Sequence, residues 1–312
     1  MATFRELFQA SIKSADTEEW FDAHFNHPIG LVFALLWNKL GVHPNAITIL
    51  SIFLGIGAGY MFYFSDLTHN LMGVVLLMLA NFCDSTDGQM ARLTGKKTLV
   101  GRVLDGFSGD VWFACIYVAI CVRLMDEPMP FIDRPWGIWI WVLCSIAGFF
   151  CHSRQSSLAD YYRQIHLLFL KGKKGSELDT YAQQRGIYEA LPIHGEWFKR
   201  LFYYNYANYC KSQEKRTPRF QSFFDKIHAT NGDAESIPET LRDEFLQGSR
   251  PLMKYTNMLS FNLRAIVLYI TCLANCPWVY FLFELTVLSA IYIYMHKQHE
   301  DLCQRCSNLI NK

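Results

Sequence analysis

The sequence has almost no net charge and few features of a secreted or nucleic-acid-binding protein. Its 29 Lys and Arg residues and 28 Asp and Glu residues leave a formal charge of +1. This balance gives no support for nucleic-acid binding, which a large basic excess would favour. The N-terminal stretch MATFRELFQASIKSADTEEW lacks an apolar core, so we expect no cleavable signal peptide.

The ten cysteines do not follow the pattern of a secreted disulfide framework. Half of them lie in apolar runs, where a thiol behaves as a small hydrophobe: Cys115, Cys121, Cys144, Cys151 and Cys272. Cys303 and Cys306 form one C-x-x-C pair near the C-terminus. Because a structural zinc site needs four ligands, we expect no metal at this pair.

Long apolar runs are present instead, although the mean hydropathy of +0.09 is low for a pure membrane bundle. The average combines apolar blocks with one long polar block. Runs of roughly 20 apolar residues are typical of membrane-spanning helices. We predict six spans, of which the fourth has a polar second half: 45–64, 70–91, 103–125, 136–158, 256–274 and 278–296. The predicted fold class is therefore all-α, a polytopic membrane protein.

Two segments lie outside these spans. Residues 1–44 include EEWFDAHFNHPIGLVFALLWNKLG, whose mixed aromatic and charged residues favour an amphipathic helix in the membrane interface. The alternative is a packed soluble helix. Residues 171–254 form the polar block, with 14 Lys and Arg and 11 Asp and Glu. Its interleaved basic and aromatic residues suit either anionic headgroups or an ordinary helical subdomain.

The predicted organisation has four parts. Residues 1–44 are interfacial, and residues 45–170 hold the first four spans. Residues 171–254 are a helical insertion, and residues 255–312 hold the last two spans and a C-terminal tail. The loops 65–69, 126–134 and 275–277 contain a single Arg134, whereas Lys and Arg gather on the other side. By the positive-inside rule, we expect the termini and the insertion to be cytoplasmic.

Four aspartates gather near the cytoplasmic ends of the second and third predicted spans: Asp84, Asp87, Asp105 and Asp110. A charged side chain at the bilayer centre costs about 2.5–3.5 kcal/mol, so ionisable groups in membrane helices usually mark a function. Asp84 and Asp87 are three residues apart and share one helix face, which Gly88 and Ala91 continue.

Grouped carboxylates in an apolar setting repel one another unless protonation or a divalent cation neutralises them. Hard oxygen ligands favour Mg²⁺ or Mn²⁺. The small residues Gly88 and Ala91 let a bulky ligand approach the backbone, and Arg92, Lys96 and Lys97 suit phosphate. The residues thus indicate a metal site for a phosphate-bearing ligand. The alternative is a set of helix-capping and loop charges.

The stretch DSTDGQMAR, then eight residues, Gly101, three residues and Asp105, resembles the signature of the CDP-alcohol phosphotransferases. That signature is D-x-x-D-G-x-x-A-R, about eight residues, then G-x-x-x-D-x-x-x-D. Seven of its eight fixed positions match: Asp84, Asp87, Gly88, Ala91, Arg92, Gly101 and Asp105. GVHPNAITILS (41–51) is also similar to the family's entry into its first helix, and the resemblance covers about residues 1–165.

The resemblance implies that a CDP-linked alcohol, commonly CDP-diacylglycerol, reacts with an acceptor hydroxyl in the bilayer and releases CMP. Two Mg²⁺ or Mn²⁺ ions would clamp the pyrophosphate. The implied metal ligands are Asp84, Asp87, Asp105 and Asp110, and the implied substrate-binding residues are Gly88, Ala91, Arg92, Gly101, Asn45 and Thr48. Family members often form homodimers, and the resemblance extends that expectation to this chain.

The match fails at the last aspartate of the signature, which is the family's usual candidate for the base. Gly109 occupies that position and Asp110 follows it. On a straight helix, Asp110 is turned about 100° from the expected direction. We expect a π-bulge, allowed by Gly106 and Gly109, to restore it to the site. The alternative is that Asp110 has another role and the chemistry is altered or lost.

Two arginines lie in or beside the later spans and suggest what the acceptor carries. Arg154 is in the fourth predicted span and Arg264 in the fifth. Intramembrane charges usually face a cavity, so both would suit an acceptor that itself carries phosphate, such as inositol phosphate or glycerol phosphate. The alternatives are a carboxylate partner or snorkelling to the interface. Glu284 is a candidate partner of Arg264, although it begins nearer the opposite leaflet.

Three functions compete at this point. The first is a phospholipid-synthesis enzyme that transfers a phosphatidyl or phospho-alcohol group, including the variant in which a lipid hydroxyl receives phosphoethanolamine or phosphocholine. The second is a transporter, which would spread polar residues through several spans. The third is a protein that binds CDP-lipid with impaired catalysis, because Gly109 replaces the last aspartate. The clustering of the carboxylates at one end of two spans favours the first.

Overall fold

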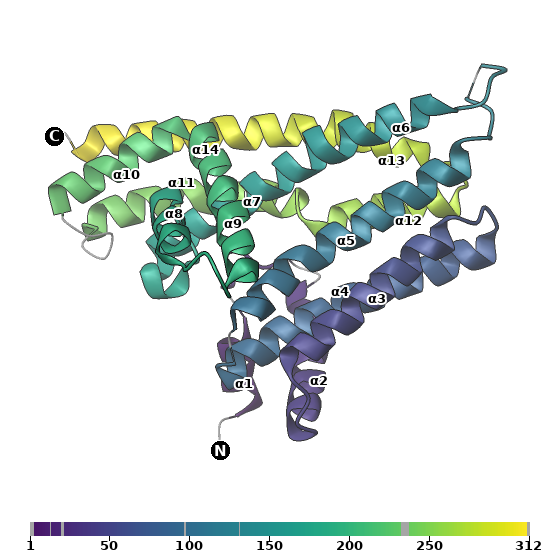
Figure 1. Ribbon diagram of the computed structural model, residues 1–312. Helices are drawn as coiled ribbons and strands as arrows, with labels where there is room; N and C mark the ends of the chain where they lie inside the picture. Colours follow the sequence, from purple (N-terminus) through teal and green to yellow (C-terminus); the bar gives the residue numbers. More distant parts are fainter. Residues whose placement is uncertain are drawn as a thin grey trace. The chain divides into compact units, whose positions relative to one another are not determined.

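A computed structural model of the chain describes residues 3–12, 14–19, 22–96, 98–130, 132–231 and 237–310 (Figure 1). The described residues form helices, with no β-strand among them. The chain divides into two compact units. The first comprises Met1–Ser153 and Phe261–Ser289, and the second comprises Arg154–Ser260 and Ala290–Lys312.

The first unit is a bundle around three long helices. Its elements are α1 (Phe4–Ser11), η1 (Asp22–Asn26), α2 (His27–Lys39), α3 (Pro44–Phe62), α4 (Leu67–Thr94), α5 (Leu99–Leu124), α6 (Ile138–Ser145), η2 (Ile146–His152), α12 (Phe261–Leu273), α13 (Trp278–Phe283) and η5 (Glu284–Leu288). Of these, η1, η2 and η5 are π-helical. Helix α3 packs against both α4 and α5.

Glycines set the close approach of α3 to α5. A Cβ atom at Gly55 would lie 1.9 Å from the Trp112 ring, and one at Gly59 would lie 3.0 Å from the Cys115 backbone. Because both distances are too short for a side chain, only glycine permits this packing. Trp112 and its apolar neighbours form the core of the unit.

Side-chain caps fix where the two aspartate-bearing helices begin. The Asp66 carboxylate accepts a hydrogen bond from the His69 backbone N–H at 3.1 Å, and Thr98 accepts one from Gly101 N–H at 3.0 Å. This backbone hydrogen bond, with the His69 ring, lowers the pKa of the exposed Asp66. Helix α4 ends at Gly95, whose φ of 67° is in the left-handed region that favours glycine.

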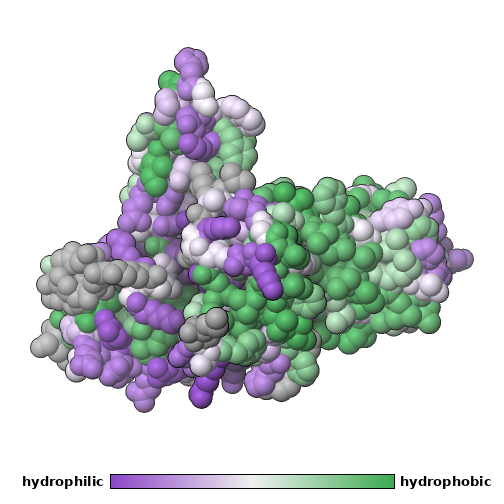
Figure 2. All heavy atoms as spheres, turned by 90° about the horizontal axis from the view of Figure 1, so that it is seen from below, coloured by the Kyte–Doolittle hydropathy of each residue, from purple (hydrophilic) through white to green (hydrophobic). Residues whose placement is uncertain are grey.

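Among the described residues, five helical stretches are long and apolar enough to cross a membrane. They are Pro44–Phe62, Leu67–Thr94, Gly101–Leu124, Glu239–Leu273 and Trp278–Ile310. Figure 2 shows the broad apolar surface over α3 and α4, to which exposed residues such as Phe53, Tyr60 and Val75 contribute. These stretches agree with an integral membrane protein and with five of the six predicted spans.

The sixth predicted span, 136–158, is helical but does not belong to this set. Its residues form α6, η2 and the start of α7, and its second half is polar. The predicted span 256–274 is interrupted by a turn at Leu259 and Ser260, between α11 and α12. The six-span count therefore stays a prediction.

The second unit contains the predicted insertion. Its elements are α7 (Ser153–Lys171), η3 (Lys173–Gly175), α8 (Tyr181–Ala190), α9 (Trp197–Arg216), α10 (Pro218–Asn231), α11 (Glu239–Met258) and α14 (Ser289–Ile310). Phe169 of α7 stacks on Phe245 of α11 with ring centroids 3.9 Å apart, and Phe223 of α10 stacks on Phe169 at 5.8 Å. Residues 171–254 thus share one core with α7, while their cytoplasmic placement stays a prediction.

Candidate active site

The carboxylate of Asp87 is the most enclosed of the four predicted site aspartates. It lies on α4, one turn after Asp84, and is 3% exposed. The charges of Asp84 and Asp105 act on it, and the Thr48 hydroxyl of α3 lies within its reach. Within the described part of the chain, its Oδ2 atom has no hydrogen-bond partner. A buried carboxylate oxygen without a partner is costly, which suggests a ligand at this position.

Ser108 connects the aspartates of the two helices. Its Oγ lies 2.7 Å from Asp84 Oδ1 and 2.9 Å from the Asp105 carbonyl oxygen, so its single proton is shared between them. Ser108 is buried on α5, one turn after Asp105. It therefore holds the Asp84 carboxylate of α4 against the α5 turn that carries Asp105.

The donor chemistry of this site fits a hard divalent cation. Asp84, Asp87 and Asp105 supply only carboxylate oxygens, and the unpartnered Asp87 oxygen is buried between helices. Across the described ranges, no three His, Cys, Asp or Glu side chains converge closely enough to hold a metal ion. Asp84 and Asp105 are thus close enough to act electrostatically on Asp87. The three carboxylates do not converge into a complete set of metal ligands.

The predicted substrate-binding residues fall into two contacts around these aspartates. Gly88 lies under the Arg92 guanidinium, since a Cβ at Gly88 would be 3.3 Å from Arg92 Nη1. Gly101 of α5 faces Asn45 of α3, whose Oδ1 would be 2.7 Å from a Cβ at Gly101. Ala91 is half-buried on α4. Glycine at positions 88 and 101 therefore leaves room that a larger side chain would fill. Lys97, which the sequence suggested as a phosphate contact, lies outside the described residues.

The N-terminal elements contact the motif helix, which sequence reasoning missed. Arg92 Nε donates to the Ser11 carbonyl oxygen of α1 at 2.5 Å. His27 of α2 lies 3.2 Å from the Ser85 hydroxyl through Nδ1, and its carbonyl accepts from Gln89 at 3.0 Å. The sequence of α1 and α2 carries no signature of these contacts. Ser108, by contrast, lies between Asp105 and Asp110, and this position in the motif could have indicated its role.

The expected π-bulge near Asp110 is wrong. Helix α5 is α-helical from Leu99 to Leu124, with no π-helical turn at Gly106 or Gly109. On a regular helix Asp110 points roughly 160° away from Ser108, the residue that touches Asp84. The neighbouring charge that acts on Asp110 is that of His152. The structure therefore gives no support to Asp110 as a ligand alongside Asp84.

The π-helical turns lie instead at His152 and Glu284, where they bring a buried charge cluster together. Arg264 Nη1 lies 2.5 Å from Glu284 Oε1, and His152 Nδ1 lies 3.0 Å from the same oxygen. Tyr280 donates to Glu284 at 2.6 Å. Arg264 and Glu284 are 1% and 0% exposed as side chains. The leaflet argument against their pairing was wrong, since facing helices bring the two groups to one depth.

Arg154 belongs to the second unit. Its side chain is exposed, and its carbonyl oxygen accepts from Arg216 at 3.4 Å. Its predicted role toward an acceptor stays a prediction.

Comparison with known proteins identifies the segment that carries these aspartates. Residues 41–166 match the model of the CDP-alcohol phosphatidyltransferase family. This segment is a CDP-alcohol phosphatidyltransferase domain. The chain is also similar to an archaetidylinositol phosphate synthase from Pyrococcus horikoshii, with 36% identity over 67 residues. That match covers 22% of this chain and about a third of the relative, 34%.

The CDP-alcohol phosphatidyltransferase domain contains the four aspartates and Arg154 but not Arg264. It also excludes α1 and α2, although both contact its motif helix. The family is one of transferases. The recognition of the motif is thus confirmed, while the roles of individual residues stay proposals.

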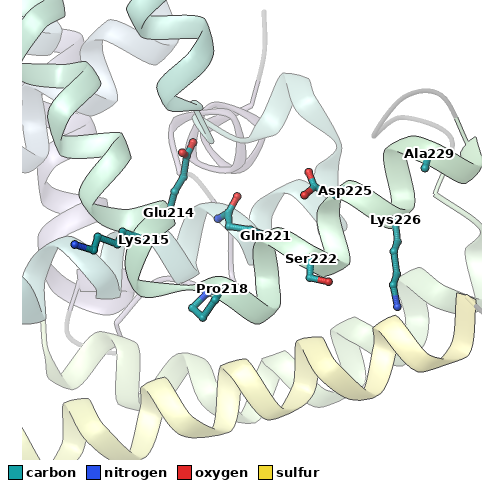
Figure 3. A pocket seen from close by; sticks show the side chains of 8 residues that line it. All are labelled: Glu214, Lys215, Pro218, Gln221, Ser222, Asp225, Lys226 and Ala229. Atoms are coloured by element: carbon teal, nitrogen blue, oxygen red, sulfur yellow. The ribbon is translucent and has the colours of Figure 1, made fainter.

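An open pocket of about 670 Å³ lies outside the CDP-alcohol phosphatidyltransferase domain, on the second unit. It is lined by the end of α9, with Glu214 and Lys215, and by α10, with Asp225 and Lys226 further along that helix than Pro218 (Figure 3). None of the predicted site residues lines it, and its mixed charges favour no particular ligand.

Proposed function

We propose that the protein transfers a phosphatidyl or phospho-alcohol group from a CDP-alcohol, such as CDP-diacylglycerol, to an acceptor hydroxyl and releases CMP. The grouping of Asp84, Asp87 and Asp105, with Ser108 linking two of them, carries this proposal. These aspartates lie within the matched domain and on apolar helices, where a CDP-linked lipid in the bilayer could reach them. The Lys and Arg distribution supports a site on the cytoplasmic side.

We assign the roles as follows. Asp84, Asp87 and Asp105 would hold Mg²⁺ or Mn²⁺, which when bound supplies charge neutralisation at the pyrophosphate. Arg92, lying over Gly88 and held by the Ser11 carbonyl, binds a phosphate oxygen. Gly88, Ala91 and Gly101 leave room for the nucleotide, with Asn45 and Thr48 on the α3 side.

The reaction breaks one bond and forms another at the same phosphorus. The acceptor oxygen attacks the phosphorus distal to the cytidine, and the phosphorus–oxygen bond to CMP breaks. CMP leaves with the bridging oxygen and both electrons of that bond. Asp110 is the proposed base for the acceptor proton, and because it lies on the side of α5 that faces His152, it can act only on an acceptor hydroxyl that approaches from that side.

The acceptor is proposed to be a phosphorylated polyol such as inositol phosphate. The name of the Pyrococcus relative supports this class, although the similarity covers only part of each chain. Arg264 supports it less than the sequence suggests, because Glu284 and His152 already engage its guanidinium. Arg154 is the remaining basic candidate. Homodimer formation stays a prediction.

The decisive test is CMP release by the purified protein with CDP-diacylglycerol and Mn²⁺ or Mg²⁺. The panel of acceptors comprises inositol phosphate, glycerol phosphate, serine and inositol. CDP-ethanolamine or CDP-choline with diacylglycerol tests the other donor class. We expect release with a phosphorylated polyol. Release only with diacylglycerol and a CDP-amino-alcohol would support the ethanolamine- or choline-type reaction instead.

A second candidate is a CDP-lipid-binding protein with impaired catalysis. The regular course of α5, which turns Asp110 away from Ser108, favours it specifically. Asp110→Asn separates the two candidates. An enzyme that uses Asp110 as its base loses about 100-fold or more in CMP release. A binding protein shows no release before or after the change and retains CDP-diacylglycerol binding.

A further inference from the structure

The exposed face of α9 is apolar at one end and basic at the other. Trp197, Leu201 and Tyr204 are 69%, 53% and 46% exposed, and Ile193 just before the helix is 75% exposed. At 100° per residue, Trp197, Leu201 and Tyr204 lie within roughly 60° of one another around the helix. We call these three residues with Ile193 the α9 apolar stripe.

The opposite face of α9 accounts for how the helix is held in its own unit. Ala207, Cys210 and Gln213 are buried there, and Gln213 donates to the Ser157 carbonyl oxygen of α7 at 2.9 Å. Tyr204, at the edge of the α9 apolar stripe, contacts Tyr188 of α8 with ring centroids 5.7 Å apart, whereas Trp197 and Leu201 lie N-terminal to the buried positions of α9. A contiguous exposed apolar patch indicates an interaction surface.

The same stripe continues into lysines. Lys211 and Lys215 lie about two and three turns beyond Tyr204, at nearly the same angle around the helix. Both are exposed. The Lys211 ammonium lies 4.9 Å over the Tyr181 ring of α8. A Trp–Leu–Tyr stripe followed along the same face by lysines is complementary to an anionic bilayer interface when the helix tilts, so that its N-terminal half enters the acyl boundary and its C-terminal half stays at the phosphates.

The direction of α9 agrees with this partner. Figure 1 shows α9 running across the direction of α11 and α14. Helix α14 belongs to Trp278–Ile310, which is long and apolar enough to cross a membrane. Those 33 residues extend over roughly 50 Å against a hydrocarbon core of about 30 Å, so one end emerges from the membrane. A helix that runs across such an element lies along the membrane plane.

We propose that α9 is a membrane-surface helix whose apolar stripe enters the interface of an anionic bilayer, with Lys211 and Lys215 at the headgroup phosphates. This surface is separate from the proposed catalytic chemistry and does not depend on it. For residues 171–254, the proposal favours the headgroup interface over an ordinary helical subdomain.

Trp197 supplies the probe for the test. The full-length protein and its Trp197→Phe variant are placed in phosphatidylcholine–phosphatidylglycerol vesicles whose chains carry bromine either near the headgroup or near the methyl end. The difference between their emission spectra isolates Trp197. We expect a blue-shifted difference spectrum that bromine near the headgroup quenches most strongly.

A matched pair of variants controls for position. In the Trp197→Phe background, Leu201→Trp moves the probe one turn along the stripe, and Lys199→Trp moves it to the opposite side of the same helix. Among the described residues, Lys199 pairs with half-exposed Glu196 at 2.9 Å, a surface ion pair whose loss costs little stability. We expect lipid quenching at 201 and none at 199.

Four outcomes overturn the proposal. A Trp197 signal that acrylamide quenches and bromolipids do not places the face in water. A signal shielded from both quenchers indicates a protein partner, such as a second copy. Equal quenching at positions 199 and 201 shows that no particular face of α9 meets the lipid. Independence from phosphatidylglycerol would remove the proposed role of Lys211 and Lys215.

Discussion

The Ser108 hydroxyl lies 2.7 Å from the Asp84 carboxylate and so joins the two helices that carry the motif aspartates. If Asp84 binds a divalent cation, the hydrogen bond from Ser108 orients the Asp84 carboxylate toward that cation. Outer contacts of this kind typically change metal affinity by about 10- to 100-fold. Ser108→Ala is therefore expected to weaken Mn²⁺ binding by about 10-fold or more, measured directly by electron paramagnetic resonance of free Mn²⁺.

The control for Ser108→Ala is Gly106→Ala on the same helix. A Cβ at Gly106 meets no atom within 4 Å, so this variant should bind Mn²⁺ as the wild type does. Equal affinity for Ser108→Ala and wild type would show that Ser108 does not position the ligand.

Close packing of α3 on α5 predicts a sharp difference between two glycines of α3. Gly55→Ala places a methyl group against the Trp112 ring and should destabilise the bundle by about 1–3 kcal/mol. Gly57→Ala has its nearest contact at 3.5 Å, an ordinary van der Waals distance. Thermal unfolding in detergent should show a lower Tm for Gly55→Ala only. A Tm unchanged by both variants would contradict the packing.

The buried ion pair of Arg264 and Glu284 predicts a non-additive pair of variants. Arg264→Met removes the cation from the Glu284 carboxylate, which keeps its contacts with His152 and Tyr280, and removing one member of a buried pair typically costs about 3–5 kcal/mol. Arg264→Met combined with Glu284→Gln should recover much of the lost stability. Additive losses in the unfolding midpoints would indicate that the two side chains do not interact.

The cap of α4 predicts a pH-dependent contribution to stability. Hydrogen bonding from His69 lowers the pKa of Asp66 below its usual value of 3.8. The carboxylate thus contributes fully above that value, and its contribution is lost as the pH falls through the lowered pKa. The Tm difference between wild type and Asp66→Ala should shrink as the pH is lowered from neutral toward about 3. A difference that is constant or grows on acidification would contradict this.

Features written into local sequence could be predicted, and those set by contacts between distant residues could not. The motif spacing located Asp84, Asp87 and Asp105, and apolar runs located five membrane-length helices. The course of α5 at Asp110 could not be read from glycines, because glycine permits a bulge without requiring one. The π-helical turns at His152 and Glu284 depend on tertiary contacts that no local pattern encodes.

Contacts from outside the matched domain are the second kind of feature that the sequence conceals. Arg92 is held by the carbonyl of Ser11, and a carbonyl is present at every residue, so no side-chain pattern marks it. From the sequence, Glu284 is a candidate partner of Arg264, with its depth along the span as the argument against the pairing. The depth of a residue in the membrane cannot be estimated from its position along its own helix alone. It also depends on where the facing helix begins, and this brings Arg264 and Glu284 to the same level.

The central claim is that the aspartates on α4 and α5 carry metal-dependent release of CMP. It is tested most directly by comparing CMP release from CDP-diacylglycerol by wild type and Asp87→Asn across a Mn²⁺ titration, with Mn²⁺ binding measured on the same samples. Asp66→Asn, an exposed aspartate of the same helix, is the control. We predict that Asp87→Asn loses at least about 100-fold in rate and weakens Mn²⁺ binding, while Asp66→Asn does neither. Undiminished, Mn²⁺-dependent release by Asp87→Asn would contradict the account.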